Sequence, residues 1–349
     1  MPVITADSFT DIYYSSFFFA GFQELAATGK CVLKTWRGAP RVHVDGGGNP
    51  FHAILLFSAR DKEKETLFCI DTRDQSDWEH GYHKELLKAC DHYFKVNFRP
   101  EVIDMTRPGV DKIHPVPIFF PVRPMALSAL FPRPFPCQEA GWTMKKIMRR
   151  LTRMGTLPAM TFLTASRQTA ITHDIVFAVR FYGEHRHAAE DARRRRLIEG
   201  LRNLPGRKVL AGFVSKNPMP TDYEALRIPG FTLKGYMKAL SGSRVCIYIR
   251  GLHDCLSFKL GQLLAMGKPI VGERILNNRD FYYSHPGINE QFAFDSVEDI
   301  LAAVENRLEQ PAILDRHARL NRALFDEKLS PATVCQNILD TCQSLGRTY

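Results

Sequence analysis

Asp254, Ser257 and Lys259 place a carboxylate, a hydroxyl and an ammonium group close together within the stretch 250–272, RGLHDCLSFKLGQLLAMGKPIVG. An ammonium group binds anions, and the unpaired N–H groups at the start of a helix bind them as well. If a helix begins near Ser257, both features meet at one end of it. These residues therefore predict a site for a polar or phosphorylated ligand.

The elements around this stretch predict how its side chains are positioned. The apolar run 243–249 has the β-branched composition of a buried parallel strand. A helix follows from about Leu256 to Met266, with Gly267 at its C-terminal cap, and Pro269 opens the next apolar run. Strand, helix and strand in this order form a β-α-β unit, and ligands bind such units beyond the carboxyl ends of the strands.

The end of this helix, Leu263-Leu-Ala-Met-Gly-Lys-Pro269, resembles the donor-site unit of GT-B glycosyltransferases, including exostosin-like enzymes and bacterial enzymes similar to glycosyltransferase family 1. Many retaining members carry two Glu residues on this helix, and the matching positions, eight apart, are Asp254 and Gln262. Lys259 lies where these relatives often have Arg or Lys. The resemblance implies that Asp254 and Gln262 bind hydroxyl groups of the donor sugar or ribose. The alternative is an ordinary β-α-β unit with solvated polar residues.

A second polar group follows a buried strand in the first half of the chain. The strand ends at Asp71. Arg73 and Asp74 follow it, and a helix is expected over 78–90. This order resembles the acceptor-binding half of GT-B enzymes, and on that topology the three side chains face the cleft between the domains. The alternative is that Asp74 or Asp77 caps the helix.

A third group lies at the start of the second half of the chain. The strand expected over 174–182 ends in Arg180, Tyr182 and Gly183. In GT-B donor domains the first strand–helix loop contacts the nucleotide diphosphate. Arg180 is the candidate for that contact because a guanidinium group matches phosphate geometry and keeps its charge. The alternative is a surface arginine at the end of a strand.

The predicted site residues divide by role. The predicted donor-binding residues are Arg180, Tyr182, Gly183, Arg250, Gly251, Ser257, Lys259 and Gln262. The predicted catalytic residues are Asp71, Asp74, Asp254 and Lys259, and the predicted acceptor-binding residues are Asp45 and Arg73.

The resemblance also implies a reaction. The chain has no Asp-x-Asp triplet, which GT-A glycosyltransferases need for a divalent ion. The function implied is therefore metal-independent transfer of a sugar from a nucleotide-sugar donor to a glycan or other hydroxyl acceptor, without a cofactor. Cations and a helix N-terminus would stabilise the leaving diphosphate or phosphate. An inverting enzyme also needs a general base on the acceptor side. The candidates are His43, Asp45, Asp71 and Asp74. The spacing of Asp254 and Gln262 leans towards retention instead.

The length of 349 residues suits two domains rather than one. The expected fold class is α/β, with two Rossmann-like domains facing across a cleft in the GT-B arrangement. We expect an acceptor-binding domain over 1–160 and a donor-binding domain over 161–325. Residues 326–349 are expected to form a C-terminal helix that packs back towards the first domain.

The net charge of +10 and the pI near 9.2 indicate an anionic partner, such as a phosphorylated substrate, an anionic membrane or a nucleic acid. Basic residues cluster at 145–153 and 193–196. The first cluster predicts an amphipathic basic helix that either contacts an anionic membrane or presents a solvated face. Nucleic acid is not expected as a partner, because the basic residues are not interleaved with stacking aromatics.

The N-terminal sequence MPVITADSFTD has neither the basic start nor the apolar core of a signal peptide. We expect a cytoplasmic protein, with peripheral contact at the inner face of the membrane if the basic helix binds there. The eight cysteines form no C-x-x-C pair, so no metal site is predicted. Two other functions remain open: a catalytically silent basic α/β scaffold that binds nucleic acid or anionic membrane, and an epimerase or phosphorylase with the same two-domain plan.

Overall fold

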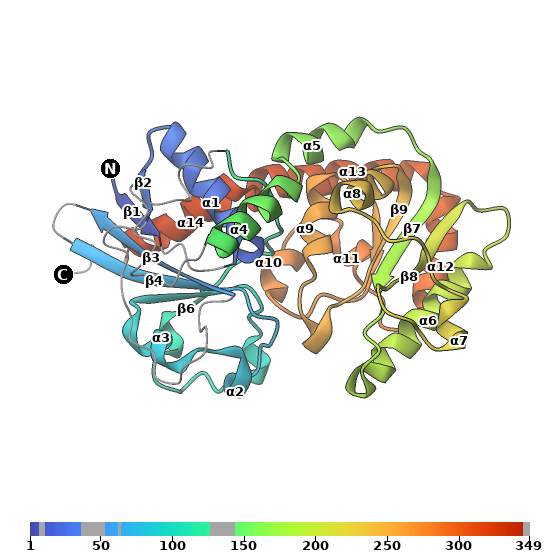
Figure 1. Cartoon of the computed structure of the whole chain (residues 1–349), viewed down its shortest axis with the longest axis horizontal. Helices are drawn as coiled ribbons and strands as arrows, with labels where there is room; N and C mark the ends of the chain where they lie inside the picture. The colour runs from blue at the N-terminus through green and yellow to red at the C-terminus, as the bar shows by residue number, and fades with distance from the viewer. Residues whose placement is uncertain (7–10, 36–52, 62–63, 126–143, 345–349) are drawn as a thin grey trace.

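The computed structural model describes residues 1–6, 11–35, 53–61, 64–125 and 144–344. The described part contains two β-sheets with helices packed around both (Figure 1). The predicted α/β fold is therefore confirmed. None of the described helices is both long enough and apolar enough to cross a membrane.

The first sheet is mixed, with the strand order β2-β1-β3-β4-β5-β6. β3 runs antiparallel to both β1 and β4, and the other pairs are parallel. A doubly wound sheet would run mostly parallel, so this half departs from the simple Rossmann-like pattern. The strands are β1 (Val3–Ala6), β2 (Val32–Thr35), β3 (Ile54–Asp61), β4 (Lys64–Asp71), β5 (His92–Lys95) and β6 (Ile113–Pro115).

The second sheet is parallel throughout, with the strand order β10-β9-β7-β8. The chain moves outward in one direction from β7 to β8 and in the other direction from β9 to β10. The order therefore reverses between β7 and β9, and ligands bind beyond the carboxyl ends of strands at such a point. The strands are β7 (His173–Arg180), β8 (Val209–Val214), β9 (Ser243–Tyr248) and β10 (Ile270–Gly272).

The helices agree with the apolar spacing in most places. The α-helices are α1 (Ile12–Ala27), α2 (Trp78–Gly81), α3 (Lys84–Ala89), α4 (Met144–Thr156), α5 (Met160–Ala165), α6 (Ala188–Arg202), α7 (Thr221–Glu224), α8 (Leu233–Ser241), α9 (Phe258–Ala265), α10 (Arg279–Tyr283), α11 (Ile288–Gln291), α12 (Val297–Leu308), α13 (Pro311–Leu324) and α14 (Pro331–Ser344). Shorter 3₁₀ turns are η1 (Pro100–Val102), η2 (Val110–Lys112), η4 (Ser166–Gln168), η5 (His185–His187) and η6 (Leu252–Asp254), and η7 (Phe325–Leu329) is a π-helical segment.

The single helix predicted over 78–90 is wrong, because two short helices occupy this stretch. Tyr82 and His83 between them have extended backbone angles. The His83 side chain caps α3 by accepting a hydrogen bond from the Leu86 amide at 3.3 Å. This local cap offers the backbone an alternative to continuing the first helix.

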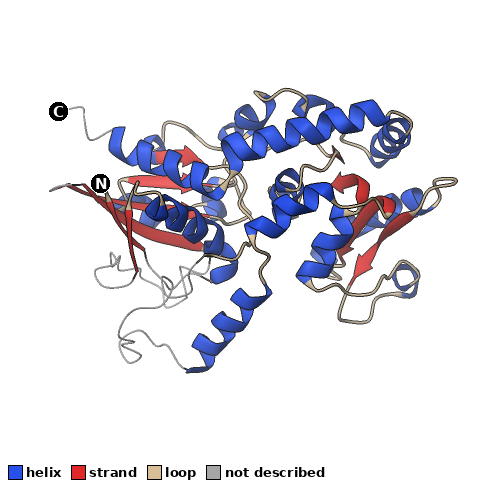
Figure 2. Ribbon diagram, turned by 90° about the horizontal axis from the view of Figure 1, so that it is seen from above, coloured by secondary structure: helices blue, strands red, loops and turns tan. Residues whose placement is uncertain are grey.

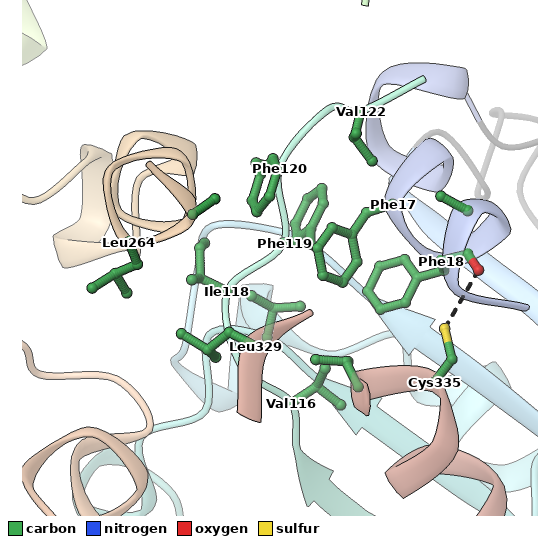
Figure 3. Close-up of a cluster of buried hydrophobic side chains, with 14 of the residues drawn as sticks. Phe17, Phe18, Val116, Ile118, Phe119, Phe120, Val122, Leu264, Leu329 and Cys335 are labelled. Carbon is green, nitrogen blue, oxygen red and sulfur yellow. Dashed lines mark hydrogen bonds between the residues drawn. The ribbon is translucent and has the colours of Figure 1, made fainter. Parts of the chain in front are cut away.

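One hydrophobic core joins the two sheets. The extended segment 116–122 runs between α1 and α9 (Figure 3). Phe17 of α1 packs edge-on against Phe120 of this segment, with ring centroids 5.2 Å apart, and Leu264 of α9 lies in the same cluster. Fully burying one such side chain stabilises a protein by roughly 1.5–3 kcal/mol. The shared core therefore fixes the two halves of the chain against each other.

The last helix, α14, packs against the first, α1. Gly21 of α1 lies so close to α14 that a Cβ atom would overlap the Pro331 carbonyl oxygen and the Cys335 sulfur. The Cys335 thiol donates to the Phe18 carbonyl at 3.4 Å (Figure 3). The two ends of the described chain therefore meet in one half of the molecule, as the ribbon in Figure 2 also shows.

Candidate active site

A cavity of about 1020 Å³ lies at the carboxyl ends of β7 and β8. Its walls are the end of β7 with the loop that follows (178–183), the end of β8 with the turn that follows (214–218) and the N-terminal end of α8. Tyr13 of α1 reaches the cavity from the first half of the chain. Among the described residues, those that line the cavity include the cations Arg180 and Lys216, and none of them carries a carboxylate. Such a lining favours a ligand that is aromatic or apolar in part and negatively charged in part.

Two side chains of α6 hold the loop after β7 in place. The Asp191 carboxylate accepts hydrogen bonds from the Tyr182 amide at 3.1 Å and from the Gly183 amide at 2.9 Å. Arg194 donates to the Arg180 carbonyl and to the Tyr182 hydroxyl, each at 3.0 Å. These amides are therefore already occupied, which leaves the exposed Arg180 side chain as the group of this loop that can meet an anion.

Lys259 lies directly behind the cavity wall. Its Nζ donates to the carbonyl oxygen of Ala178, a wall residue, at 2.9 Å. The ring of Tyr236, which also lines the cavity, is 5.6 Å from Nζ, and the ring of Phe177 is 5.8 Å away. Among the described residues no carboxylate pairs with Lys259, and the Tyr236 hydroxyl is buried without a hydrogen-bond partner. Enclosure by protein atoms, together with the positive charge of Arg194, lowers the pKa of Lys259 to about 7.

The position of Lys259 follows from the start of α9. The Ser257 side chain caps this helix and accepts a hydrogen bond from the Lys259 amide at 3.4 Å. Lys259 is therefore in the first turn, and helical side chains lean towards the N-terminus of their helix. Because Lys259 lies at the start of the helix, as predicted, its ammonium group points towards the end of β7.

The loop between β9 and α9 holds two consecutive strained residues. His253 and Asp254 have φ angles of +56° and +59°, in the left-handed region that non-glycine residues rarely adopt. The Asn277 side chain donates to the Asp254 carbonyl at 2.8 Å, and the Gly251 amide donates to the Cys255 carbonyl at 2.9 Å. Gly251 is needed because a Cβ atom would overlap the Cys255 sulfur. Strain of this kind costs of order 1–3 kcal/mol per residue and is often found at functional sites.

Asp254 and Arg250 belong to an ion-pair chain. The Asp254 carboxylate lies 3.2 Å from Arg250 and 3.8 Å from Arg99 of the first half. The Arg250 amide also donates to Glu273 at 2.7 Å. Gln262 is 4 % exposed within α9. None of Arg250, Gly251, Asp254, Ser257 and Gln262 is in the described cavity lining, so the structure does not bring them together there with Arg180, Tyr182 and Gly183.

Asp71 lies at the centre of a buried ion-pair cluster. Its side chain is 0 % exposed and contacts Arg73 at 2.6 Å and Lys95 at 3.3 Å, and the Tyr93 hydroxyl donates to it. Burial raises the pKa of Asp71, but the charges of Lys95 and Arg73 and the Tyr93 hydrogen bond outweigh it, so the net pKa is lowered. Asp71 was predicted to be catalytic and Arg73 to bind the acceptor. In the structure they form an ion pair with each other, and this placement gives Asp71 a structural role.

Asp74 has the opposite surroundings. Its side chain is accessible to solvent, yet protein atoms surround it on most sides. This enclosure raises the pKa of Asp74, although Cys255, Lys95 and His253 act in the other direction. The Asp74 charge in turn contributes to the raised pKa of Tyr14 in α1, after burial of that tyrosine. Asp74 therefore lies where the 71–77 loop, α1 and the 250–257 loop meet.

The other sequence features resolve into structural contacts or lie outside the described residues. In the run 193–196, three arginines form ion pairs with acidic residues on other elements and Arg194 is buried beneath the cavity loop. The partners of Arg193, Arg195 and Arg196 are Glu273, Asp222 and Glu298. His43 and Asp45 lie outside the described residues. In the described part of the chain, no group of three or more His, Cys, Asp or Glu side chains is placed so that it could bind a metal ion.

Sequence reasoning missed Asp191, Arg194 and Tyr13. The first two fall in the helix that follows β7, and acidic residues are common in a first helical turn for reasons of capping alone. Tyr13 lies in α1, 167 positions before the end of β7 at Arg180, so no local pattern points to it. Comparison with protein-family models and with curated proteins gives no match.

Proposed function

We propose that the protein is a glycosyltransferase that moves a sugar from a nucleotide-sugar donor to a hydroxyl acceptor, with two Rossmann-like domains in the GT-B arrangement. The observation that supports this most is Lys259, an ammonium group behind a carboxylate-free cavity at the ends of β7 and β8, with no anionic partner among the described residues. A diphosphate entering the cavity would supply that partner.

The residues have distinct roles in this reaction. Arg180 and Lys259 stabilise the negative charge that develops on the leaving nucleotide. The aromatic side chains of the cavity hold the nucleoside. Asp74 takes the proton of the acceptor hydroxyl, because its raised pKa makes it a stronger base than an ordinary aspartate. The acceptor approaches from the first half of the chain, on the side of Asp74 and Tyr13.

A nucleotide screen tests this function. We expect one of UDP, GDP, ADP, dTDP and CMP to raise the melting temperature of the protein, since a ligand at 100 times its Kd adds roughly 2.7 kcal/mol. Lys259→Met removes a charge-assisted hydrogen bond and should weaken this nucleotide by about 10- to 100-fold. Isothermal titration calorimetry measures the loss directly.

Lys268→Met is the matched control for this variant. Lys268 is buried, and like Lys259 it donates its Nζ to a backbone carbonyl, that of Ser241 at 2.9 Å, away from the described cavity lining. We expect this substitution to leave nucleotide affinity unchanged. If no nucleotide binds and the protein instead binds RNA or anionic vesicles in a salt-sensitive manner, the transferase proposal is wrong.

Nucleotide affinity should also depend on pH through Lys259. Its pKa of about 7 means that the cation is present below pH 7 and lost as the pH rises above it. An anionic ligand needs the cation, so affinity should fall by about tenfold or more between pH 7 and 9. Lys259→Arg should flatten this profile, because a guanidinium group does not titrate in this range. A wild-type profile as flat as that of the arginine variant would contradict this assignment.

A further inference from the structure

The turn after β8 forms one end of the cavity, and two of its carbonyl oxygens already accept hydrogen bonds. Arg227 donates to the Ser215 carbonyl at 2.6 Å and to the Asn217 carbonyl at 2.9 Å. The nearest carboxylate, Glu224, pairs with Arg227 and also accepts from the Met219 amide at 3.2 Å. These contacts hold the turn in place and leave few acceptors for a ligand.

The same end of the cavity is rich in donors. Lys216 and Asn217 are exposed lining residues, and their side chains form no hydrogen bond or ion pair with other described residues. Thr232 and Leu233 at the start of α8 also line the cavity. The Thr232 side chain accepts from the Gly235 amide at 3.0 Å, and the amides of Leu233 and Lys234 in the first turn have no partner within the helix. Lysine offers donors only, whereas the Asn217 amide offers both donors and an acceptor.

The residues around these donors are largely apolar. Pro218, Pro220, Phe231 and Leu233 line this end beside one cation, Lys216, whereas Arg180 and the wall in front of Lys259 bring two cations to the other end. A nucleoside diphosphate fits this polarity with its phosphates at the cationic end and its base against the turn. Its polar edge then meets the donors of Lys216, Asn217 and α8.

Bases differ in what they present to such an edge. Uracil and thymine present two carbonyl oxygens and one N–H group, whereas cytosine replaces one oxygen by an amino group and adenine carries an amino group and no carbonyl. Guanine has one carbonyl but three N–H donors. An amino group facing a donor-rich surface leaves donors on both sides unpaired, and each unpaired donor costs about 1–3 kcal/mol once the bound base covers it.

We propose that the cavity selects the base of its nucleotide through carbonyl oxygens, and that this base is uracil or its 5-methyl analogue thymine. The inference rests on the proposed function and adds the class of donor to it. Lys216 and Asn217 are the specificity-determining side chains, and Arg227 positions the turn that carries them.

The test compares nucleotides that differ in one group. Calorimetric titration of the full chain with UDP and CDP isolates the exchange of a carbonyl for an amino group on the same ring. We expect UDP to bind at least about tenfold more tightly than CDP. GDP, ADP and dTDP complete the series, and dTDP against UDP separates thymine with deoxyribose from uracil with ribose.

One isosteric substitution should change the selectivity. Asn217→Asp replaces a donor by an acceptor at the base end, so it should narrow the ratio between UDP and CDP by about tenfold. Asn203→Asp makes the same change of charge at the exposed C-terminal cap of α6 and should leave the ratio unchanged.

The outcomes separate this inference from the function on which it rests. If CDP, ADP or GDP binds as tightly as UDP and dTDP, or if Asn217→Asp leaves the ratio unchanged, the base assignment is wrong while the nucleotide site stands. If none of the five diphosphates binds, the proposed function fails and the base assignment fails with it.

Discussion

Asp71→Asn is expected to lower the free energy of unfolding by about 3–5 kcal/mol, because it removes one partner of a buried ion-pair cluster. The substitution keeps the size of the side chain and takes away its charge. Lys95, which is 0 % exposed, would then face a neutral amide 3.3 Å away. Burial already lowers the pKa of Lys95, and Asp71 is the charge that raises it again. Urea unfolding followed by circular dichroism measures the loss.

The pH dependence of this loss has a definite sign. The pKa of Asp71 is lowered in the folded protein, so its contribution to stability is present above the pKa of an unfolded aspartate and is lost as the pH falls through the folded value. The wild type and Asp71→Asn should therefore approach each other in acid. Asp77→Asn is the control within the same loop. Asp77 caps α2 by accepting from the His80 amide at 2.9 Å, and asparagine caps equally well. A loss below about 1 kcal/mol for Asp71→Asn would mean that the cluster is not a buried ion pair in solution.

The sequence predicts the elements that carry the site better than the contacts that complete it. Lys259 was predicted because a buried strand, a polar loop, a short helix and a second strand follow one another, and each has a local signature. Arg180 was found because a strongly apolar strand ends there. These signals are local, since propensity and hydrophobic period act over a few residues.

The features that the sequence did not predict depend on contacts between distant residues. The first sheet is not parallel throughout because β3 runs antiparallel to its neighbours. This direction depends on pairing with β1, more than 50 residues earlier. Asp71 and Asp74 are three positions apart and look alike in sequence. Lys95 and Tyr93 of β5 contact Asp71 directly, whereas Lys95 acts on Asp74 only through its charge. Only this packing separates a structural aspartate from an accessible one.

That distinction leads to the second large effect. Asp74→Asn is expected to lower the turnover of sugar transfer by about 10²–10⁴-fold, because a general base contributes to that extent and an amide cannot accept the proton. Nucleotide affinity should stay unchanged, since Asp74 is outside the described cavity lining. Release of the nucleotide from the matching nucleotide sugar, with and without acceptor, measures turnover, and calorimetry measures affinity.

The pH profile of the same variants separates a base from a residue that only supports the loop. The pKa of Asp74 is raised, so the acidic limb of kcat/KM in the wild type should lie above the range of an ordinary aspartate. Asp74→Glu keeps a carboxylate and should keep this limb at reduced turnover, whereas Asp74→Asn should lose it. If the residual activity of Asp74→Asn still falls in acid with the wild-type limb, another group is the base. A loss of activity accompanied by an equal loss of nucleotide affinity would instead mean that Asp74 supports the neighbouring 250–257 loop, where it interacts with Cys255 and His253.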